Sequence, residues 1–170
     1  MTDFRQIMLN SGLDAADVRI LESLQRAGRL TNVELASQVG LSPSPCLRRV
    51  RDLEEAGFIT GYAAQLDRRK LGFGVHAFVE IKIEQNVAAG EAFRRAIEAM
   101  PEVISCFVMS GTLDFLVQVV ARDLDEYAEL FVKRLWRLPG IKDMRSSFVL
   151  DAVKHSAALP VASSGAGAAA

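Results

Sequence analysis

Three arginines lie within four positions of the chain. Guanidinium groups are well suited to binding phosphates and base edges of nucleic acid. Arg48, Arg49 and Arg51 follow two serines, Ser42 and Ser44. At about 100° per residue, Ser44, Arg48 and Arg51 share one side of a helix, with Arg49 on its flank. A guanidinium fork can bind guanine in the major groove, and hydroxyls can bind phosphates. These five residues are therefore the candidate DNA-binding set.

The same arginines also have a simpler explanation. Asp52, Glu54 and Glu55 lie close enough along the helix to pair with them, which would make the run an ordinary solvated face. The chain has a net charge of −1, and residues 1–60 carry one more acidic than basic residue. DNA binding would therefore depend on a local patch and not on the charge of the whole molecule.

A second candidate site is the segment from Ser110 to Asp114, which reads SGTLD. A tight turn at Gly111 and Thr112 would expose backbone N–H groups that can hold a carboxylate. Asp114 can then pair with an ammonium group, so the segment could bind both charged groups of a free amino acid. Ordinary turn chemistry explains the same residues, and the residues alone leave both readings open.

The arginines are placed on the second of two short helices. Thr31 and Glu34 form a capping box at the start of the first helix. Gly40 ends that helix, because glycine adopts a left-handed backbone at little cost. Ser42 is expected to cap the second helix, which runs over about 43–56.

The remainder of the first 74 residues is predicted to support this two-helix element. An earlier helix begins at its cap, Asp14, and residues 1–12 are expected to form a short arm or a frayed turn. Residues 58–66 favour two strands with a turn near Gly61, which would form either a wing or a simple connector. Residues 66–74 are the candidate linker.

The second half of the chain alternates strands and helices in the order βαββαβ, which is typical of a ferredoxin-like domain. The expected strands are 75–84, 103–109, 113–121 and 141–153, and the expected helices are 88–100 and 123–138. Residues 156–170 are small and of low complexity, so we expect a disordered tail that is dispensable for folding and dimerisation.

The segment after Thr31 resembles the leucine-responsive/asparagine-regulatory (feast/famine) family of prokaryotic transcription regulators. It reads TNVELASQVGLSPSPCLRRVRDLEEAGFITGY. The resemblance extends to about residue 155 and implies an α+β chain. The implied parts are a winged helix–turn–helix domain over 1–65, the linker over 66–74, a ferredoxin-like ligand-sensing domain over 75–155 and the tail over 156–170.

The resemblance also implies an effector site. The family pattern Ser-Gly-x-x-Asp matches the loop at Gly111, Thr112 and Asp114, and the family's ligand site lies near this loop at an interface between dimers. Thr112 stands where family members often have an acidic residue. Leu124, Phe148 and Val149 match its apolar part, although a place in the hydrophobic core would explain each of these three as well.

Nothing in the sequence indicates catalysis, a metal site or a bound cofactor. The two histidines, His76 and His155, lie far apart, and the two cysteines, Cys46 and Cys106, have no metal-ligand spacing. No apolar stretch reaches the ~18 residues of a membrane span, and no signal peptide is evident, so we expect a cytoplasmic protein.

The sequence therefore predicts a sequence-specific regulator that binds double-stranded DNA and senses a small molecule, an amino acid such as leucine. Homodimers would assemble into tetramers or octamers. One alternative is a nucleoid-organising protein with little sequence preference. Another is a ferredoxin-like small-molecule-binding protein whose helix–turn–helix contacts protein.

Overall fold

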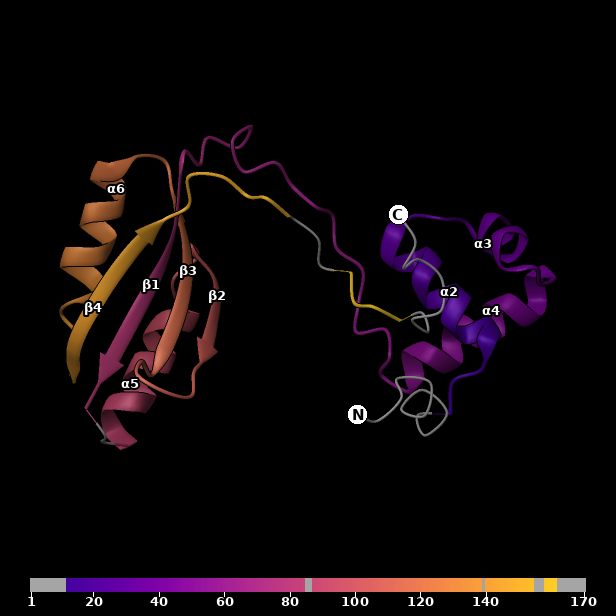
Figure 1. The fold of residues 1–170 in the computed structure, drawn as a ribbon, viewed down its shortest axis with the longest axis horizontal. Coiled ribbons are helices and arrows are strands. Elements are labelled where there is room, and N and C mark those ends of the chain that lie inside the picture. The colour runs from indigo at the N-terminus through magenta and orange to yellow at the C-terminus, as the bar shows by residue number, and fades with distance from the viewer. Residues whose placement is uncertain (1–11, 85–86, 139, 155–157, 162–170) are drawn as a thin grey trace, which may run out of the picture. The chain divides into compact units, whose positions relative to one another are not determined.

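The computed structural model describes residues 12–84, 87–138, 140–154 and 158–161, and divides them into two compact units (Figure 1). The helical unit comprises the described residues of 12–64 together with 158–161, and the sheet unit comprises those of 65–154. The expected N-terminal arm lies outside the described residues, except for Gly12. None of the helices among the described residues is long and apolar enough to cross a membrane.

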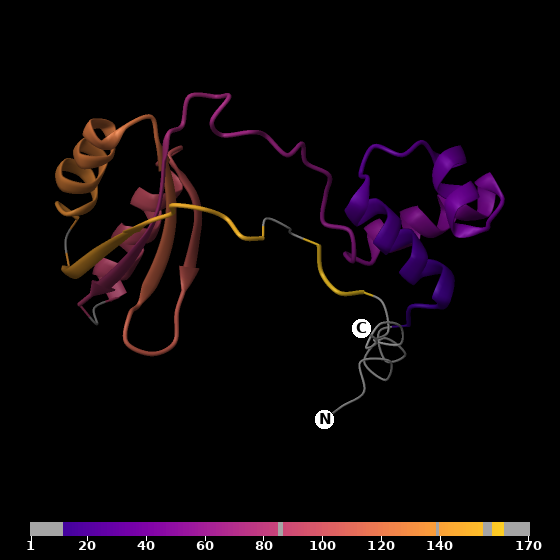
Figure 2. The same cartoon turned by 45° about the horizontal axis from the view of Figure 1, so that its top comes forward.

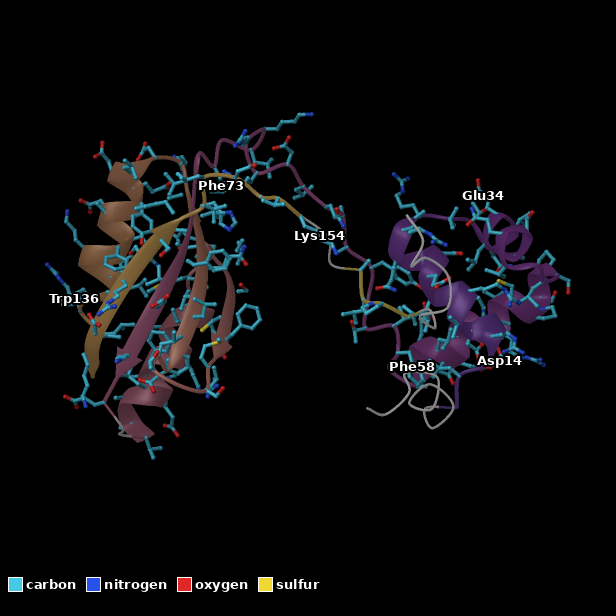
Figure 3. The ribbon with its side chains drawn as sticks, viewed as in Figure 1. Asp14, Glu34, Phe58, Phe73, Trp136 and Lys154 are labelled. Atoms are coloured by element: carbon cyan, nitrogen blue, oxygen red, sulfur yellow. The ribbon has the colours of Figure 1, made fainter. Side chains whose placement is uncertain are left out.

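The helical unit contains α2 (Ala15–Arg26), α3 (Asn32–Val39) and α4 (Pro43–Glu55). The predicted caps of α2 and α3 are confirmed. Asp14 caps α2 by accepting from the backbone N–H groups of Ala16 and Asp17, and Thr31 and Glu34 form the capping box of α3 (Figure 3). Gly40 ends α3 with a φ of 72°, in the left-handed region.

The core of this unit forms where the three helices meet. Ile20, Ala36 and Cys46 are almost completely buried, one from each helix. Leu47 is expected on the inner side of α4, but 40% of it is exposed. Helix α4 is therefore anchored to the core by Cys46 and Leu53, with the partly buried Val50 packed against the same cluster.

The hairpin expected at 58–66 is not formed, because no strand is present in this segment. The end of α4 binds the first N–H groups of this segment, since Phe58 and Ile59 both donate to the Leu53 carbonyl oxygen. Tyr62 instead donates its hydroxyl to Glu54 Oε1 at 2.9 Å. Burial and this hydrogen bond raise the pKa of Tyr62 to about 12. A two-stranded hairpin on its own is only marginally stable, so these contacts are favoured over formation of the hairpin.

The sheet unit has the predicted βαββαβ order. Its elements are β1 (Val75–Ile83), α5 (Val87–Glu98), β2 (Val103–Val108), β3 (Phe115–Ala121), α6 (Leu124–Ala128), η1 (Glu129–Leu135) and β4 (Ile141–Phe148). The strands pair antiparallel in the order β2-β3-β1-β4, which is the ferredoxin-like arrangement.

Both helical segments cover the same face of this sheet (Figure 2). Alternate residues of β1 and β3 point into that face, as the pleat of a strand requires. They pack with Phe93 of α5 and with Tyr127 and Leu135 of the second helical segment. The buried strand residues are Ala77, Val79, Ile81, Phe115, Val117, Val119 and Ala121.

The single helix expected over 123–138 is divided into the short α-helix α6 and the π-helix η1. Asp123 is the predicted cap and accepts from the N–H of Glu126 at 2.7 Å. In η1 the hydrogen bonds span five residues, as from Trp136 N–H to the Phe131 oxygen. This wider turn brings Leu130 and Leu135 onto the same side, so both are buried.

The C-terminal tail differs from expectation at its four described residues, 158–161. Leu159 forms two hydrogen bonds with Gln25 of α2, and Val161 packs against the core of the helical unit. Disorder is therefore not observed at 158–161. Residues 155–157 and 162–170 lie outside the described residues.

Arg49 connects the beginning of α2 to α4. Its Nη1 lies 2.7 Å from Asp14 Oδ2 and 2.7 Å from Asp17 Oδ1. The Asp17 side chain is only 14% exposed, so its ion pair with Arg49 is largely shielded from solvent. The pKa of Asp14 is lowered by the backbone N–H of Asp17 and by Arg49, which stabilises the charged form.

We predict that Arg49→Gln lowers the free energy of unfolding by about 1–3 kcal/mol at pH 7. Hydrogen bonds to charged groups contribute ~1.5–3 kcal/mol, and solvent screens the half-exposed Asp14. Because the folded-state pKa of Asp14 is depressed, its stabilisation is present above its ordinary pKa of 3.8 and is lost as the pH falls through the lower folded value. The difference between wild type and variant should therefore narrow in acid.

The measurement is urea unfolding at pH 7 and in acid, with Arg51→Gln as the matched control on the exposed side of the same helix. Equal stability of the Arg49 variant and wild type at pH 7 would contradict the structural role assigned to this ion pair.

Candidate nucleic-acid interface and effector loop

Helix α4 presents one polar face to solvent. Ser44, Arg48 and Arg51 are exposed at spacings of four and three residues, which puts them on the same side of the helix. Cys46 and Leu53 bury the opposite side. Within the described residues neither Arg48 nor Arg51 takes part in an ion pair, so both guanidinium groups are available to an outside partner.

The N-terminus of α4 is less rich in donors than expected. Ser42 occupies the N-cap position, but its side chain forms no capping hydrogen bond. The physical reason is Pro45, the third residue of the helix, which lacks the N–H that an N-cap hydroxyl usually accepts from. Pro43 lacks one too, so Ser44 supplies the one N–H of the first three helical residues. The Ser42 hydroxyl is consequently left for other partners.

Arg49 differs from the other two arginines, because its guanidinium is held by Asp14 and Asp17. The hydrogen bonds that Arg49 donates to Asp17 and to Asp14 raise the pKa of Arg49. A phosphate would have to compete with both carboxylates, which weighs against the DNA contact expected of this residue. The sequence did not indicate that Arg49 forms these ion pairs, since both carboxylates lie in the first turn of α2 and at its N-cap.

A second link that the sequence did not indicate joins α3 to α4. Asn32 Nδ2 donates to the Pro43 carbonyl oxygen at 2.8 Å. Because that oxygen can only accept, the contact also fixes the orientation of the Asn32 side-chain amide. The turn between the two helices is thereby tied at the residue where α4 begins.

The predicted effector loop joins β2 to β3. Gly111 is exposed and has a φ of 113°, a value that side chains other than glycine's rarely permit, and Thr112 beside it is exposed. Asp114 is partly buried and accepts from the N–H of Ile83 on Oδ2 at 2.8 Å. The backbone N–H of Asp114 also donates to the Ile81 oxygen at 3.0 Å. Asp114 thus stabilises the irregular end of β1 with one of its carboxylate oxygens.

The three apolar candidates belong to the start of α6 and to the end of β4. Leu124 begins α6 and is 62% exposed, and Phe148 ends β4 and is 45% exposed. The Phe148 ring lies 5.0 Å from that of Tyr127 in an edge-on arrangement. Val149 is partly buried, and its N–H donates to the His76 oxygen at 2.8 Å.

Within one chain these two groups of candidates lie at opposite ends of the sheet. Phe148 pairs with Ala77 near the start of β1, whereas Asp114 contacts Ile81 and Ile83 near its end. At a rise of ~3.3 Å per residue, they are separated by roughly 13–20 Å along the strand. A single free amino acid is too small to contact both groups in the same chain.

Two family models match the chain, one for each unit. A model for winged helix–turn–helix DNA-binding matches residues 13–60, and a model for the Lrp/AsnC ligand binding domain matches residues 76–159. The chain is also 42% identical over 145 residues to the leucine-responsive regulatory protein of Escherichia coli K12, covering 85% of this chain and 88% of that protein.

Solved structures agree with this relationship. A transcriptional regulator from Neisseria meningitidis, solved as a complex with L-methionine, is 42% identical with a TM-score of 0.86, over 88% of this chain and 97% of that one. An AsnC family transcriptional regulator from Agrobacterium tumefaciens is 33% identical with a TM-score of 0.81, over the same shares. These relatives are transcription regulators and not enzymes, as the sequence analysis predicted. The chain belongs to the Lrp/AsnC family of DNA-binding transcription regulators.

Proposed function

We propose that this regulator recognises particular DNA sites through the exposed face of α4 and that a free amino acid with an apolar side chain modulates this binding. The proposal for DNA binding is carried by Arg48 and Arg51, which lie beside Ser44 on the solvent side of the helix and form no ion pair with any residue that the structure describes. In the major groove such side chains can bind base edges, while Ser42 can bind a phosphate.

Leucine and methionine are the first candidates for the effector. The Escherichia coli relative is named for its response to leucine, and the Neisseria meningitidis relative was solved with L-methionine. Both molecules combine an ammonium, a carboxylate and an apolar side chain. In this chain, the backbone at Gly111 and Thr112 would hold the carboxylate, and Asp114 would pair with the ammonium through its second oxygen.

The site would be completed by a second copy of the chain. Leu124, Phe148 and Val149 can supply apolar contact, but in one chain they lie too far from Asp114 to share one amino acid with it. An interface between copies can bring the loop of one chain near the apolar group of another. Effector binding and assembly are then linked, since a ligand favours the assembly that completes its site.

The face of the sheet opposite the helices offers a surface for the first step of assembly. Phe107 of β2 pairs with Leu116 of β3 on this face, and Phe107 is 53% exposed. A polar row runs beside them, in which Ser105 donates to Gln118 at 2.8 Å and Gln118 lies 2.7 Å from His76 Nε2. We propose that homodimers form on this face and then associate into tetramers or octamers.

A DNA-binding regulator of this family would act in the cytoplasm. The two cysteines agree with a reducing compartment, because Cys46 is buried, Cys106 is exposed and both are free thiols.

The effector class can be tested by thermal unfolding of the full chain with single amino acids. Ligands that bind only the native state raise its melting temperature. We expect leucine or methionine to raise it in a concentration-dependent manner, with glutamate and lysine as controls of the same size class but with charged side chains. A response to the charged amino acids alone would refute the apolar assignment.

Arg48→Ala should weaken binding to a preferred DNA site by about 1–3 kcal/mol and relax its sequence preference, if Arg48 contacts a base. Arg95→Ala is the control, because Arg95 is an exposed arginine of the sheet unit. Anisotropy titrations against preferred and scrambled duplexes separate the two effects. If both affinities fall by the same factor, Arg48 contacts phosphate only, and if neither changes in a folded variant, α4 does not bind DNA through this face.

Asp114→Asn should weaken effector binding by more than tenfold and leave ligand-free DNA binding close to wild type. Asparagine retains an oxygen that can accept from the Ile83 N–H, so the end of β1 is preserved and the negative charge alone is lost. Losing one partner of a hydrogen-bonded charge pair costs ~2–5 kcal/mol.

Calorimetric titration with leucine or methionine measures the effector affinity of the Asp114 variant and of wild type. Asp143→Asn is the control on β4. If the Asp114 variant binds the effector as tightly as wild type, the carboxylate has only its observed role at the end of β1.

A further inference from the structure

The end of α2 holds an extended piece of the C-terminal tail. The side-chain amide of Gln25 binds both backbone polar groups of Leu159: its Nε2 donates to the Leu159 oxygen at 3.1 Å, and its Oε1 accepts from the Leu159 N–H at 2.6 Å. A side-chain amide that pairs with a donor and an acceptor on the same residue imitates the pairing of two strands. Two bonds in this arrangement also fix the direction of the tail.

The side chain of Leu159 takes little part in the contact, since it is 74% exposed. The apolar contribution comes instead from Val161, which is partly buried and packs against the core cluster of the helical unit. Pro160 lies between them and restricts the backbone, so less conformational freedom is lost on docking. The contact thus combines a backbone recognition point with one apolar anchor two residues further along.

We infer that residues 158–161 are a docking segment and that Gln25 is the receptor group for it on the DNA-binding unit. The occupant is this chain's own tail, because the chain leaves the helical unit at residue 64, forms the sheet unit and returns to the helical unit at its C-terminal end. The DNA-binding unit is therefore attached to the sensing unit twice, by the connection that follows residue 64 and by the tail.

Docking of so short a segment is weak for a free peptide, because ordering the backbone opposes it. Covalent attachment raises the local concentration of the segment and makes the contact possible. Such a contact can open and close while both units remain folded. This inference does not depend on the identity of the effector or of the DNA site.

Amide hydrogen exchange of the full chain tests the inference at the Leu159 N–H. In wild type we expect exchange at this position to be slowed by about tenfold relative to a peptide of residues 154–165, a factor that corresponds to ~1.4 kcal/mol. Gln25→Ala should abolish the protection. Alanine favours helix at this exposed position, so α2 should remain folded. Gln38→Ala is the matched control, an exposed glutamine on α3.

A second pair of variants tests the apolar anchor. Val161→Ser should reduce the protection of the Leu159 N–H, and Val153→Ser should not, because Val153 is 99% exposed. Exchange in wild type at the rate of the free peptide, or full protection in Gln25→Ala, would overturn the inference. Protection that disappears on dilution would assign the docked tail to another copy and would overturn its assignment to the same chain.

Discussion

The ion pairs of Arg49 with Asp14 and Asp17 determine what the helical unit can offer to DNA. They hold α4 against the first turn of α2, at the end where the Asp14 cap also lies. With Arg49 occupied inside the unit, Arg48 and Arg51 remain on the solvent side with Ser44. One arginine of the three thus positions the helix, and the other two are the ones that we propose for DNA. This division explains how a chain with a net charge of −1 can still present a local basic face.

A comparable constraint operates in the sheet unit. The antiparallel order β2-β3-β1-β4 places the β2–β3 loop at one end of the sheet and the last residue of β4 at the other. The polar and apolar parts of the proposed effector site are therefore separated by the length of β1. If the two parts bind one amino acid, more than one chain must take part. Effector sensing and assembly then become a single equilibrium, which is how a small ligand can influence the DNA-binding unit.

Local features were predictable from the sequence, and distant pairings were not. The caps at Asp14 and Thr31 and the left-handed Gly40 depend on neighbours within a few residues, so the pattern of residue types was sufficient. The strand order followed from the βαββαβ pattern. The role of Arg49 could not be predicted, because its carboxylate partners are more than thirty residues away. The composition of residues 58–66 favours strands and so a wing over the alternative of a simple connector, whereas in the structure the end of α4 binds the first N–H groups of this segment.

The candidate sites show the same difference between local features and pairings of residues that are distant in the sequence. Ser44, Arg48 and Arg51 share a face as the helical period requires, and the loop at Gly111 forms between two strands as expected. The hydrogen bond from the Ile83 N–H to Asp114 depends on the pairing of β1 with β3, which residue types do not reveal. The docking of Val161 was missed for a different reason: the composition of the tail predicts disorder, and one valine with a receptor glutamine is too small a signal to detect.

The most direct test of effector-controlled DNA binding is a reciprocal titration. The full chain would be titrated with a DNA site selected from genomic fragments, with and without saturating leucine or methionine, and then with the amino acid, with and without that DNA. Coupling between two sites must be equal in both directions and is typically 5–150-fold. We expect the amino acid to change the DNA affinity by such a factor and the DNA to change the amino-acid affinity by the same factor. Tight binding of both ligands with no effect of either on the other would contradict the proposed regulation.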